Sequence, residues 1–362
     1  MLSSFLLCIS LFGNDHSLLS KTIKGRPDNL SKVSGHKSIS LIQVPGDDNI
    51  DNFYMSETEI SNSQYLEFLN SAISTNDIYY SEADEMVYTH SGEQMLNLGG
   101  HRVIKDHDGD GIFTLDEMEN PLNRSYISFN ADTNRFQIVD PKTVDWNQYF
   151  DKSVYPDVVD TINDWAELNS EKSGFVGNGD QDLELPTIEE IKEWPVTHIR
   201  YFGAKAFADY YGYELPTMAQ WFYAGKGGQE FEYATSDGNI SESSAWYNTE
   251  AVNPPFPIHK GHAQPVRSLN PNPYGLYNLG GNVWEWVQDW HNPQDDTYFL
   301  DSNISDLRID TNSPLSQDNQ LKKGLLGGSF NYFPRIMATD WKHSAYVNAG
   351  NDHFGFRIVL NK

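Results

Sequence analysis

The chain has 362 residues, of which 13% are aromatic, and its 25 Lys and Arg against 51 Asp and Glu give a formal net charge of −26 at pH 7. This composition excludes a disordered acidic chain and predicts a folded protein with a substantial core. The negative charge disfavours nucleic acids and anionic membrane surfaces as partners, and it favours cations. The single cysteine, Cys8, excludes an intrachain disulfide.

The N-terminal segment contains an apolar run from Phe5 to Phe12 that is typical of a short secretory signal, although no Lys or Arg precedes it. We expect residues 1–20 to form a signal or anchor and residues 21–38, which are polar and rich in Ser and Gly, to form a linker. No later run reaches the roughly 18 apolar residues of a membrane span. The pattern favours an extracytoplasmic protein that is periplasmic, secreted or lipid-anchored.

The folded domain is expected over residues 39–362. A strand is predicted in "SISLIQV", residues 38–44. The following "NSQYLEFLNSA" has apolar residues at helical spacing, and Ser61 or Asn62 is suited to the N-cap. Two more helices are predicted on either side of Pro216, which ends the first, while Thr217 caps the second. Between the first helix and these two, residues 76–194 show poor periodicity and indicate an inserted subdomain.

A calcium-loop pattern lies within this insertion. "DHDGDGIFTLDE" matches D-x-[DN]-x-[DN]-G-x5-E at each fixed position. Its oxygen ligands would be the carboxylates of Asp106, Asp108, Asp110 and Glu117 and the carbonyl of Ile112. The flanking residues are not typical of two long helices, so we expect a fixed structural site rather than a sensor. A solvated acidic loop is the alternative.

The stretch "NPYGLYNLGGNVWEWVQDW", residues 272–290, predicts an extended segment after Gly turns, with Val283, Trp284, Trp286 and Val287 packed in the core. It resembles the "YGLYDMxGNVWEWxxDW" motif of the formylglycine-generating enzyme, or sulfatase-modifying factor, family. "YMSETEISNSQYLEFL", the "LPTMAQW" region, "GGSF" and "FGFRIV" resemble further motifs of that family in the same order. The resemblance covers about residues 40–74 and 195–362.

The resemblance implies an α+β fold of the C-type-lectin-like kind, loop-rich, with a twisted antiparallel sheet and a few helices. It also implies a structural calcium at the "NLGGNVWE" segment. The ligands carried over by position are the side chains of Asn278 and Glu285 and the carbonyls of Gly281 and Val283, which form an all-oxygen set.

The catalytic positions of the family do not match in this chain. The family's enzymes hold copper with two cysteines at the third and eighth positions after the serine of GGS, and counting from Ser329 these are Tyr332 and Met337. Two thiolates suit Cu(I), whereas Tyr is a poor ligand for it. We therefore expect no copper chemistry of the usual kind, and the catalytic residues are unknown.

A non-haem iron enzyme is one alternative and would need histidine ligands. His343 and His353 lie in the corresponding region, and His259 and His262 form H-x-x-H, but none has a telling 2-His-1-carboxylate spacing. A second alternative is a hypervariable display protein of the same fold, which would bind a ligand through its final segment.

The residues after GGS offer aromatic, amide and cationic groups suited to recognition. The candidate ligand-binding residues are Asn331, Tyr332, Arg335, Trp341 and Tyr346. We therefore predict an exported calcium-binding family member that acts in binding or as an accessory protein. Its partner would be an unknown protein or small molecule.

Overall fold

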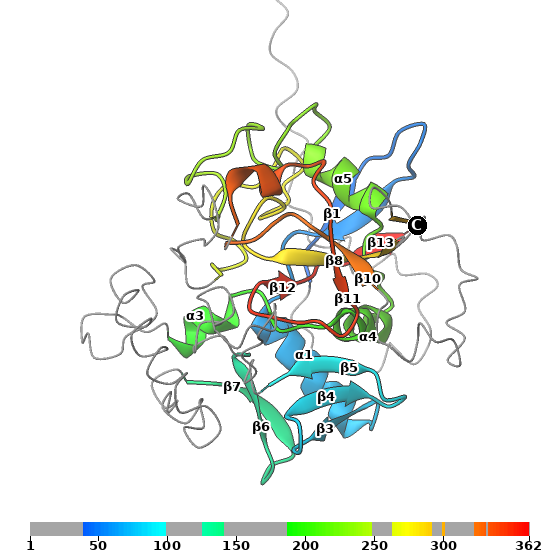
Figure 1. The fold of residues 1–362 in the computed structure, drawn as a ribbon, viewed down its shortest axis with the longest axis vertical. Helices are drawn as coiled ribbons and strands as arrows, with labels where there is room; N and C mark the ends of the chain where they lie inside the picture. The colour runs from blue at the N-terminus through cyan, green and yellow to red at the C-terminus, as the bar shows by residue number, and fades with distance from the viewer. Residues whose placement is uncertain are drawn as a thin grey trace, which may run out of the picture. The chain divides into compact units, whose positions relative to one another are not determined.

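The computed structural model of the protein describes residues 39–98, 125–140, 187–247, 263–291, 299–300, 322–330 and 332–361 (Figure 1). All of them belong to one compact unit, residues 36–362. The expected signal or anchor, the linker, the calcium loop 106–117 and His259 with His262 lie outside the described residues. In the part of the chain that is described, no helix has both the length and the apolar character needed to cross a membrane.

Strand β2 (Phe53–Ser56) is the centre of the first sheet. It lies between β1 (Leu41–Val44) and β13 (Val359–Asn361) and is antiparallel to both. The strand predicted in "SISLIQV" is therefore confirmed as β1. Phe53 and Met55 are buried against the core, and Tyr54 between them is only half-buried, as expected of a strand with one face covered. This sheet joins the first and the last described parts of the chain.

Strand β8 (Trp284–His291) is the centre of the second sheet, which has the order β11-β10-β8-β12 (Figure 1). Leu326 pairs with Glu285, and Phe354 pairs with Trp284 in the sheet's parallel ladder. The pairing brings the segments that carry WEW, GGS and FGF side by side. The other strands of this sheet are β9 (Phe299–Leu300), β10 (Lys322–Leu326), β11 (His343–Tyr346) and β12 (Phe354–Gly355).

Helix α1 (Asn62–Ser74) begins at a capping box. The Ser61 Oγ accepts from the Gln64 N–H at 3.4 Å, and Gln64 Oε1 accepts from the Ser61 N–H at 2.9 Å. This satisfies backbone donors that a helix N-terminus otherwise leaves unpaired. Ser61, one of the two predicted N-caps, is thus confirmed, and the helix buries the predicted apolar residues.

The two helices predicted around Pro216 are present, but the prediction that Pro216 ends the first is wrong, because a left-handed glycine ends it four residues earlier. Helix α4 (Tyr201–Tyr211) ends at Gly212, whose φ of 74° is left-handed, and α5 (Met218–Lys226) begins at a capping box built on Thr217. The side chain of Asp289, from β8, accepts from the Met218 N–H at 2.7 Å. The N-terminus of α5 is therefore fixed to the central strand of the second sheet.

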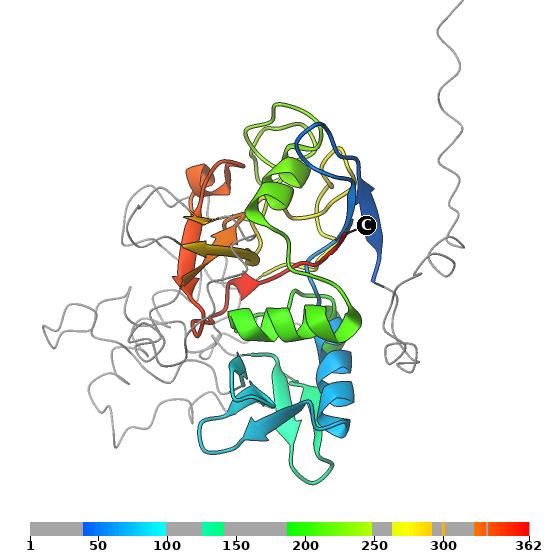
Figure 2. The same cartoon turned by 90° about the vertical axis from the view of Figure 1, so that its right-hand side faces the viewer.

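The segment predicted as an insertion is described in part, and its described elements pack against α1 and α4 (Figure 2). Both groups of the Asn70 side-chain amide bond the backbone of Phe136, and the Arg200 N–H donates to the Met95 carbonyl at 3.0 Å. These elements are β3 (Ile78–Ser81), β4 (Met86–Thr89), β5 (Gln94–Asn97), β6 (Ile127–Asn130), β7 (Arg135–Ile138) and α3 (Ile188–Lys192).

The "NVWEWV" segment runs through the core, as predicted. Val283, Trp286 and Val287 have no exposed surface, and Trp284 is 1% exposed. Trp221 of α5 is equally buried and packs with Leu279, Val287 and Leu326 in one cluster. Fully burying each aliphatic side chain of this cluster contributes about 1.5–3 kcal/mol, so the cluster stabilises the packing of α5 against β8 and β10.

Candidate functional site

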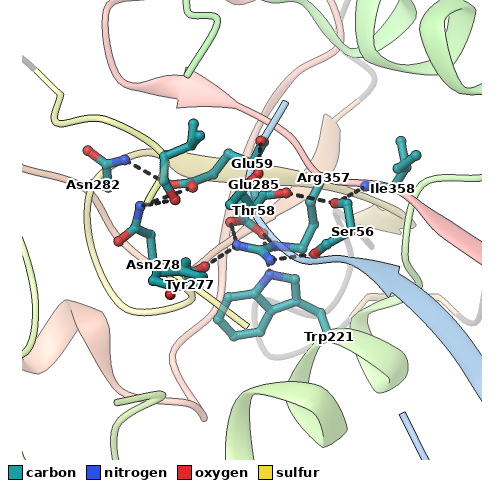
Figure 3. Close-up of polar contacts among 11 residues, drawn as sticks. Ser56, Thr58, Glu59, Trp221, Tyr277, Asn278, Asn282, Glu285, Arg357 and Ile358 are labelled. Atoms are coloured by element: carbon teal, nitrogen blue, oxygen red, sulfur yellow. Dashed lines mark hydrogen bonds and ion pairs between the residues drawn. The ribbon is translucent and has the colours of Figure 1, made fainter. Parts of the chain in front are cut away.

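A buried ion pair joins β8 to the segment that follows β12. Arg357 donates from Nε to Glu285 Oε2 at 2.6 Å and from Nη2 to Oε1 at 2.7 Å (Figure 3). Neither side chain has exposed surface. The indole N–H of Trp221 also donates to Oε2, at 2.7 Å. The Glu285 carboxylate therefore receives three N–H donors.

The other hydrogen bonds of Arg357 reach two more segments. Nη1 donates to the carbonyl of Ser56 at the end of β2, at 3.1 Å, and Nη2 donates to the carbonyl of Tyr277 at 2.7 Å. A buried guanidinium is tolerated only when its charge is paired and its donors are satisfied. Arg357 meets both conditions and so fixes β2, the turn around residue 277 and β8 to one another.

Glu59 is a second buried carboxylate beside this ion pair. Its side chain has no exposed surface. Oε1 accepts from the side-chain amide of Asn282 at 2.8 Å, and Oε2 accepts from that of Asn278 at 3.1 Å (Figure 3). Burial raises the pKa of Glu59 to about 8; the Arg357 charge lowers it and the Glu285 charge adds to the rise. Among the described residues no cation forms a direct salt bridge with Glu59, unlike Glu285.

The calcium ligands implied by the family resemblance are placed in one turn and the strand that follows it. Asn278 and Gly281 have φ of 53° and 92°, and the Gly281 N–H donates to the Gly327 carbonyl at 2.8 Å. The carboxylate of Glu285, however, is directed at Arg357. A carboxylate offers about four lone-pair positions, and three of them here face N–H donors. About one lone-pair position of Glu285 is then left for a cation, and calcium at this turn stays a prediction.

The other predicted calcium ligands, Asp106, Asp108, Asp110, Ile112 and Glu117, lie outside the described residues. Within the described ranges, no group of three or more His, Cys, Asp or Glu side chains is placed to hold a metal ion. Calcium binding at the acidic loop therefore stays a prediction.

The GGS turn is built on two glycines in left-handed conformations. Gly327 has φ of 95° and Gly328 has φ of 73°. A Cβ on Gly328 would lie 2.2 Å from Met337 Cε and 2.5 Å from its Sδ. Met337, the second family cysteine position, is fully buried in the 3-10 helix η4 (Pro334–Met337). Its thioether therefore packs directly on the turn.

The first family cysteine position, Tyr332, packs among aromatic rings. Its ring meets Trp284 edge-on at a centroid distance of 5.5 Å and His353 at 5.6 Å. Burial raises the pKa of Tyr332, and the nearby charge of Asp352 adds to this. The phenol is therefore neutral at physiological pH, the opposite of an anionic thiolate.

The two histidines of this region are held by different neighbours. His343 packs against Trp284 with a ring-centroid distance of 5.0 Å, and His353 Nδ1 lies 2.6 Å from Asp352 Oδ1. His353 therefore lies next to Tyr332, and His343 lies next to Trp284, which Tyr332 also contacts. Within the described part of the chain, these histidines do not belong to a group of three or more His, Cys, Asp or Glu side chains placed to hold a metal ion.

The predicted ligand-binding residues make separate local contacts with neighbouring side chains. Arg335 stacks over Trp341 at 5.2 Å and pairs with Asp340 at 2.9 Å. Tyr346 is 43% exposed, with the Lys322 amine 4.7 Å from its ring. Asn331 lies outside the described residues. The structure therefore offers accessible aromatic and cationic groups in this final segment.

Lys323 on β10 is a buried cation that sequence reasoning missed. It is 4% exposed, and its amine lies 3.6 Å from the Trp290 ring centroid and donates to the Gln288 carbonyl. Burial lowers the pKa of Lys323 to about 7, against the attraction of Asp289. Two adjacent lysines in "LKKGLL" gave no indication of which one points inward.

Glu59 and Arg357 were missed as site residues for another reason. Both stand in segments that resemble family motifs, "ETEISN" and "FGFRIV", and the single cation Arg357 among apolar neighbours is a usable signal, whereas Glu59 lies among polar residues and gives none. The sequence does not show that Arg357 pairs with Glu285, because the two residues are 72 positions apart. Their contact follows from the strand order, not from any local pattern.

The described residues form an α+β fold with short, mainly antiparallel strands and few helices, as predicted from the sequence. The sequence profile described as "Sulfatase-modifying factor enzyme 1-like domain" matches residues 43–362. The chain therefore belongs to this family.

Similar proteins include formylglycine-generating enzymes from Streptomyces coelicolor, 38% identical over 115 residues, and Thermomonospora curvata, 34% identical over 150 residues. The alignments cover 30% and 40% of this chain and 35% and 47% of those proteins. The serine/threonine-protein kinase pkn1 of Chlamydia pneumoniae is 29% identical over 167 residues, which are 46% of this chain and 24% of that protein. The chain thus spans less than half the length of these relatives.

Two solved structures overlap with the fold to a limited extent. CarF matches with a TM-score of 0.43 and 14% identity, covering 91% of this chain and 95% of that one. PvdO from Pseudomonas aeruginosa matches with a TM-score of 0.34 and 19% identity, covering 56% and 76%.

Proposed function

We propose that this chain is an exported, calcium-stabilised family member that acts in binding or as an accessory protein and lacks the family's copper chemistry. The proposal rests on the side chains at the two family cysteine positions. Tyr332 is packed between Trp284 and His353, and Met337 is buried against Gly328. Neither side chain is a thiolate, and Cu(I) sites are built from soft sulfur ligands.

A binding role is supported by the accessible groups of the final segment. The stacked pair of Arg335 and Trp341 and the exposed Tyr346 are residue types enriched in recognition surfaces. The ligand would be a protein or a small molecule that presents apolar or aromatic groups to them.

Export and calcium binding are supported by sequence patterns. The apolar run Phe5–Phe12 favours export, and the loop Asp106–Glu117 carries the full calcium-loop pattern. Calcium is abundant outside the cytoplasm and would offset part of the charge of −26.

Copper binding and cysteine oxidation together test this function. The purified protein is titrated with Cu(I) against a competing chelator and then incubated with a cysteine-containing sulfatase peptide and oxygen. We expect no stoichiometric copper and no aldehyde product. The variant Tyr332→Cys/Met337→Cys restores both thiolates and serves as the matched comparison. Tight copper or iron in the unmodified protein, lost on His343→Ala or His353→Ala, would support an oxidoreductase instead.

A further inference from the structure

The sheet of β3, β4 and β5 carries aromatic and polar side chains side by side (Figure 1). Tyr79 on β3 pairs with Tyr88 on β4, and Tyr88 pairs with Gln94 on β5. Directly paired residues of neighbouring strands point to the same face of a sheet. Gln94 Oε1 accepts from Nη1 of Arg200, the residue that precedes α4. We call these four residues, Tyr79, Tyr88, Gln94 and Arg200, the tyrosine–arginine row.

The tyrosine end of the row is a flat aromatic surface. The rings of Tyr79 and Tyr88 are stacked, with centroids 5.2 Å apart and an interplanar angle of 12°. Tyr79 is 46% exposed, and Tyr88 is half-buried, with its hydroxyl donating to the Asp84 carboxylate. Because Asp84 holds Tyr88 and Tyr88 stacks on Tyr79, the surface is ordered before a ligand binds, which lowers the entropy cost of binding.

The arginine end of the row has donors without acceptors. Of the five N–H groups of a guanidinium, the described residues accept from Arg200 only through Gln94 Oε1, and its Nε is buried without a partner. Burial lowers the pKa of Arg200 to about 10, against the attraction of Tyr88 and Asp84, so the side chain stays charged at neutral pH. Buried donors without acceptors are rare in native proteins, and a ligand that supplies the acceptor is one explanation of them.

The charges around the row select an uncharged ligand. The net charge of −26 and the carboxylate of Asp84 disfavour an anion, and the guanidinium of Arg200 disfavours a cation. The guanidinium requires oxygen acceptors, whereas the tyrosine surface requires an apolar face. A pyranose ring offers both, since C–H groups lie on its faces and hydroxyl oxygens lie on its rim.

We propose that the tyrosine–arginine row binds a neutral saccharide, with a sugar ring packed on Tyr79 and Tyr88 and its hydroxyl oxygens accepting from Arg200. Gln94 orients the guanidinium, and the Asp84 carboxylate has further lone pairs that accept from sugar hydroxyls. The row contains no residue of the final segment to which the proposed function assigns recognition. The inference therefore stands independently of that function.

Titration calorimetry with neutral oligosaccharides tests the proposal. The full chain is titrated with cellohexaose, maltohexaose and chitohexaose, and we expect at least one of them to bind with a Kd below about 1 mM. Tyr79→Ala should weaken this binding at least about tenfold, because it removes the stacking surface, and Tyr79→Phe, which keeps the ring, should lose less. The control is Arg267→Met, which removes an exposed arginine paired with Glu57 and should leave the affinity within about twofold.

Two comparisons test the uncharged class of the ligand. Arg200→Lys keeps the positive charge but lacks the planar fork of donors, so it should weaken binding at least about tenfold, as should Arg200→Met. Hexagalacturonate, a chain of the same length that carries carboxylates, should bind more weakly than the neutral hexasaccharide. Tighter binding of hexagalacturonate, or full affinity in Arg200→Lys, overturns the inference.

The remaining outcomes separate this site from the final segment. Absence of binding by all three neutral hexasaccharides overturns the inference, as does equal affinity of Tyr79→Ala and the unmodified protein. Saccharide binding that is lost in Tyr346→Ala and kept in Tyr79→Ala would support recognition by the final segment and overturn the tyrosine–arginine row. Binding that is lost in Tyr79→Ala and kept in Tyr346→Ala supports the row.

Discussion

Glu285 and Arg357 form a fully buried two-point ion pair, with Nε–Oε2 of 2.6 Å and Nη2–Oε1 of 2.7 Å. Arg357→Met would leave the Glu285 carboxylate buried without a counter-charge, so we expect the free energy of unfolding to fall by about 3–5 kcal/mol. Urea unfolding measures this loss.

The exposed pair of Arg335 and Asp340 is the matched control, since such pairs contribute at most about 1 kcal/mol. Arg335→Met should therefore be far milder than Arg357→Met. Equal losses in the two variants would contradict the role given to the buried pair.

Lys323 predicts a stability change on the alkaline side. Its pKa is about 7 in the folded chain against 10.5 for the ordinary side chain. Between these values the unfolded chain binds more protons than the folded one, so the contribution of Lys323 to stability rises with pH from about 7 to 10.5. Urea midpoints in Lys323→Met should lack this rise, whereas Lys322→Met, on the adjacent residue, should keep it.

The raised pKa of Glu59 leads us to expect a loss of stability with rising pH, in a lower pH range than for Lys323. Its pKa is raised from 4.5 to about 8, so the folded chain holds a proton that the unfolded chain has lost, and stability falls as pH rises through that window. Glu59→Gln should remove this fall in calcium-free buffer. A parallel dependence in the variant and the unmodified protein would show that another group is responsible.

Gly328→Ala should destabilise the GGS turn in two ways. Its φ of 73° is unfavourable for alanine, and its new Cβ would collide with Met337. Gly275, with φ of 90° and no atom within 4 Å of its Cβ position, isolates the backbone effect. We expect thermal unfolding to show a larger fall in melting temperature for Gly328→Ala than for Gly275→Ala. In a Met337→Ala background, which removes the colliding side chain, the additional fall caused by Gly328→Ala should be smaller.

The acidic loop predicts a calcium-dependent melting temperature. The four predicted ligand carboxylates of Asp106–Glu117 would repel one another without a cation, so chelation should lower the melting temperature of the whole protein. Asp108→Ala with Glu117→Gln should reduce that shift. A melting temperature that is insensitive to chelator would count against calcium at the acidic loop and at the Asn278–Asn282 turn.

The elements with local patterns were predictable. The N-caps at Ser61 and Thr217 bond residues only three positions later in the sequence, and the apolar residues of α1 recur with a helical period. The core position of Trp284 and Trp286 also followed from the sequence, because large apolar residues in a strand bordered by Gly turns are rarely exposed.

The partners of the charged residues were not predictable. Family resemblance predicts Glu285 as a calcium ligand by its position, but it does not give the direction of the side chain or the contact with Arg357. The contact with its partner Arg357 depends on the pairing of β12 with β8. The burial of Lys323 rather than Lys322 likewise depends on which face of β10 meets Trp290.

The position of β2 between β1 and β13 bears on biosynthesis. Arg357 bonds the Ser56 carbonyl across 301 positions, and Val359 pairs with Met55. A ribosome must release both partners before either contact can form, and at roughly 5–20 residues per second this separates their emergence by tens of seconds. During that interval the Ser56 carbonyl and strand β2 lack these two partners, so a nascent chain is expected to remain open to chaperones and proteases until residues 357–361 emerge.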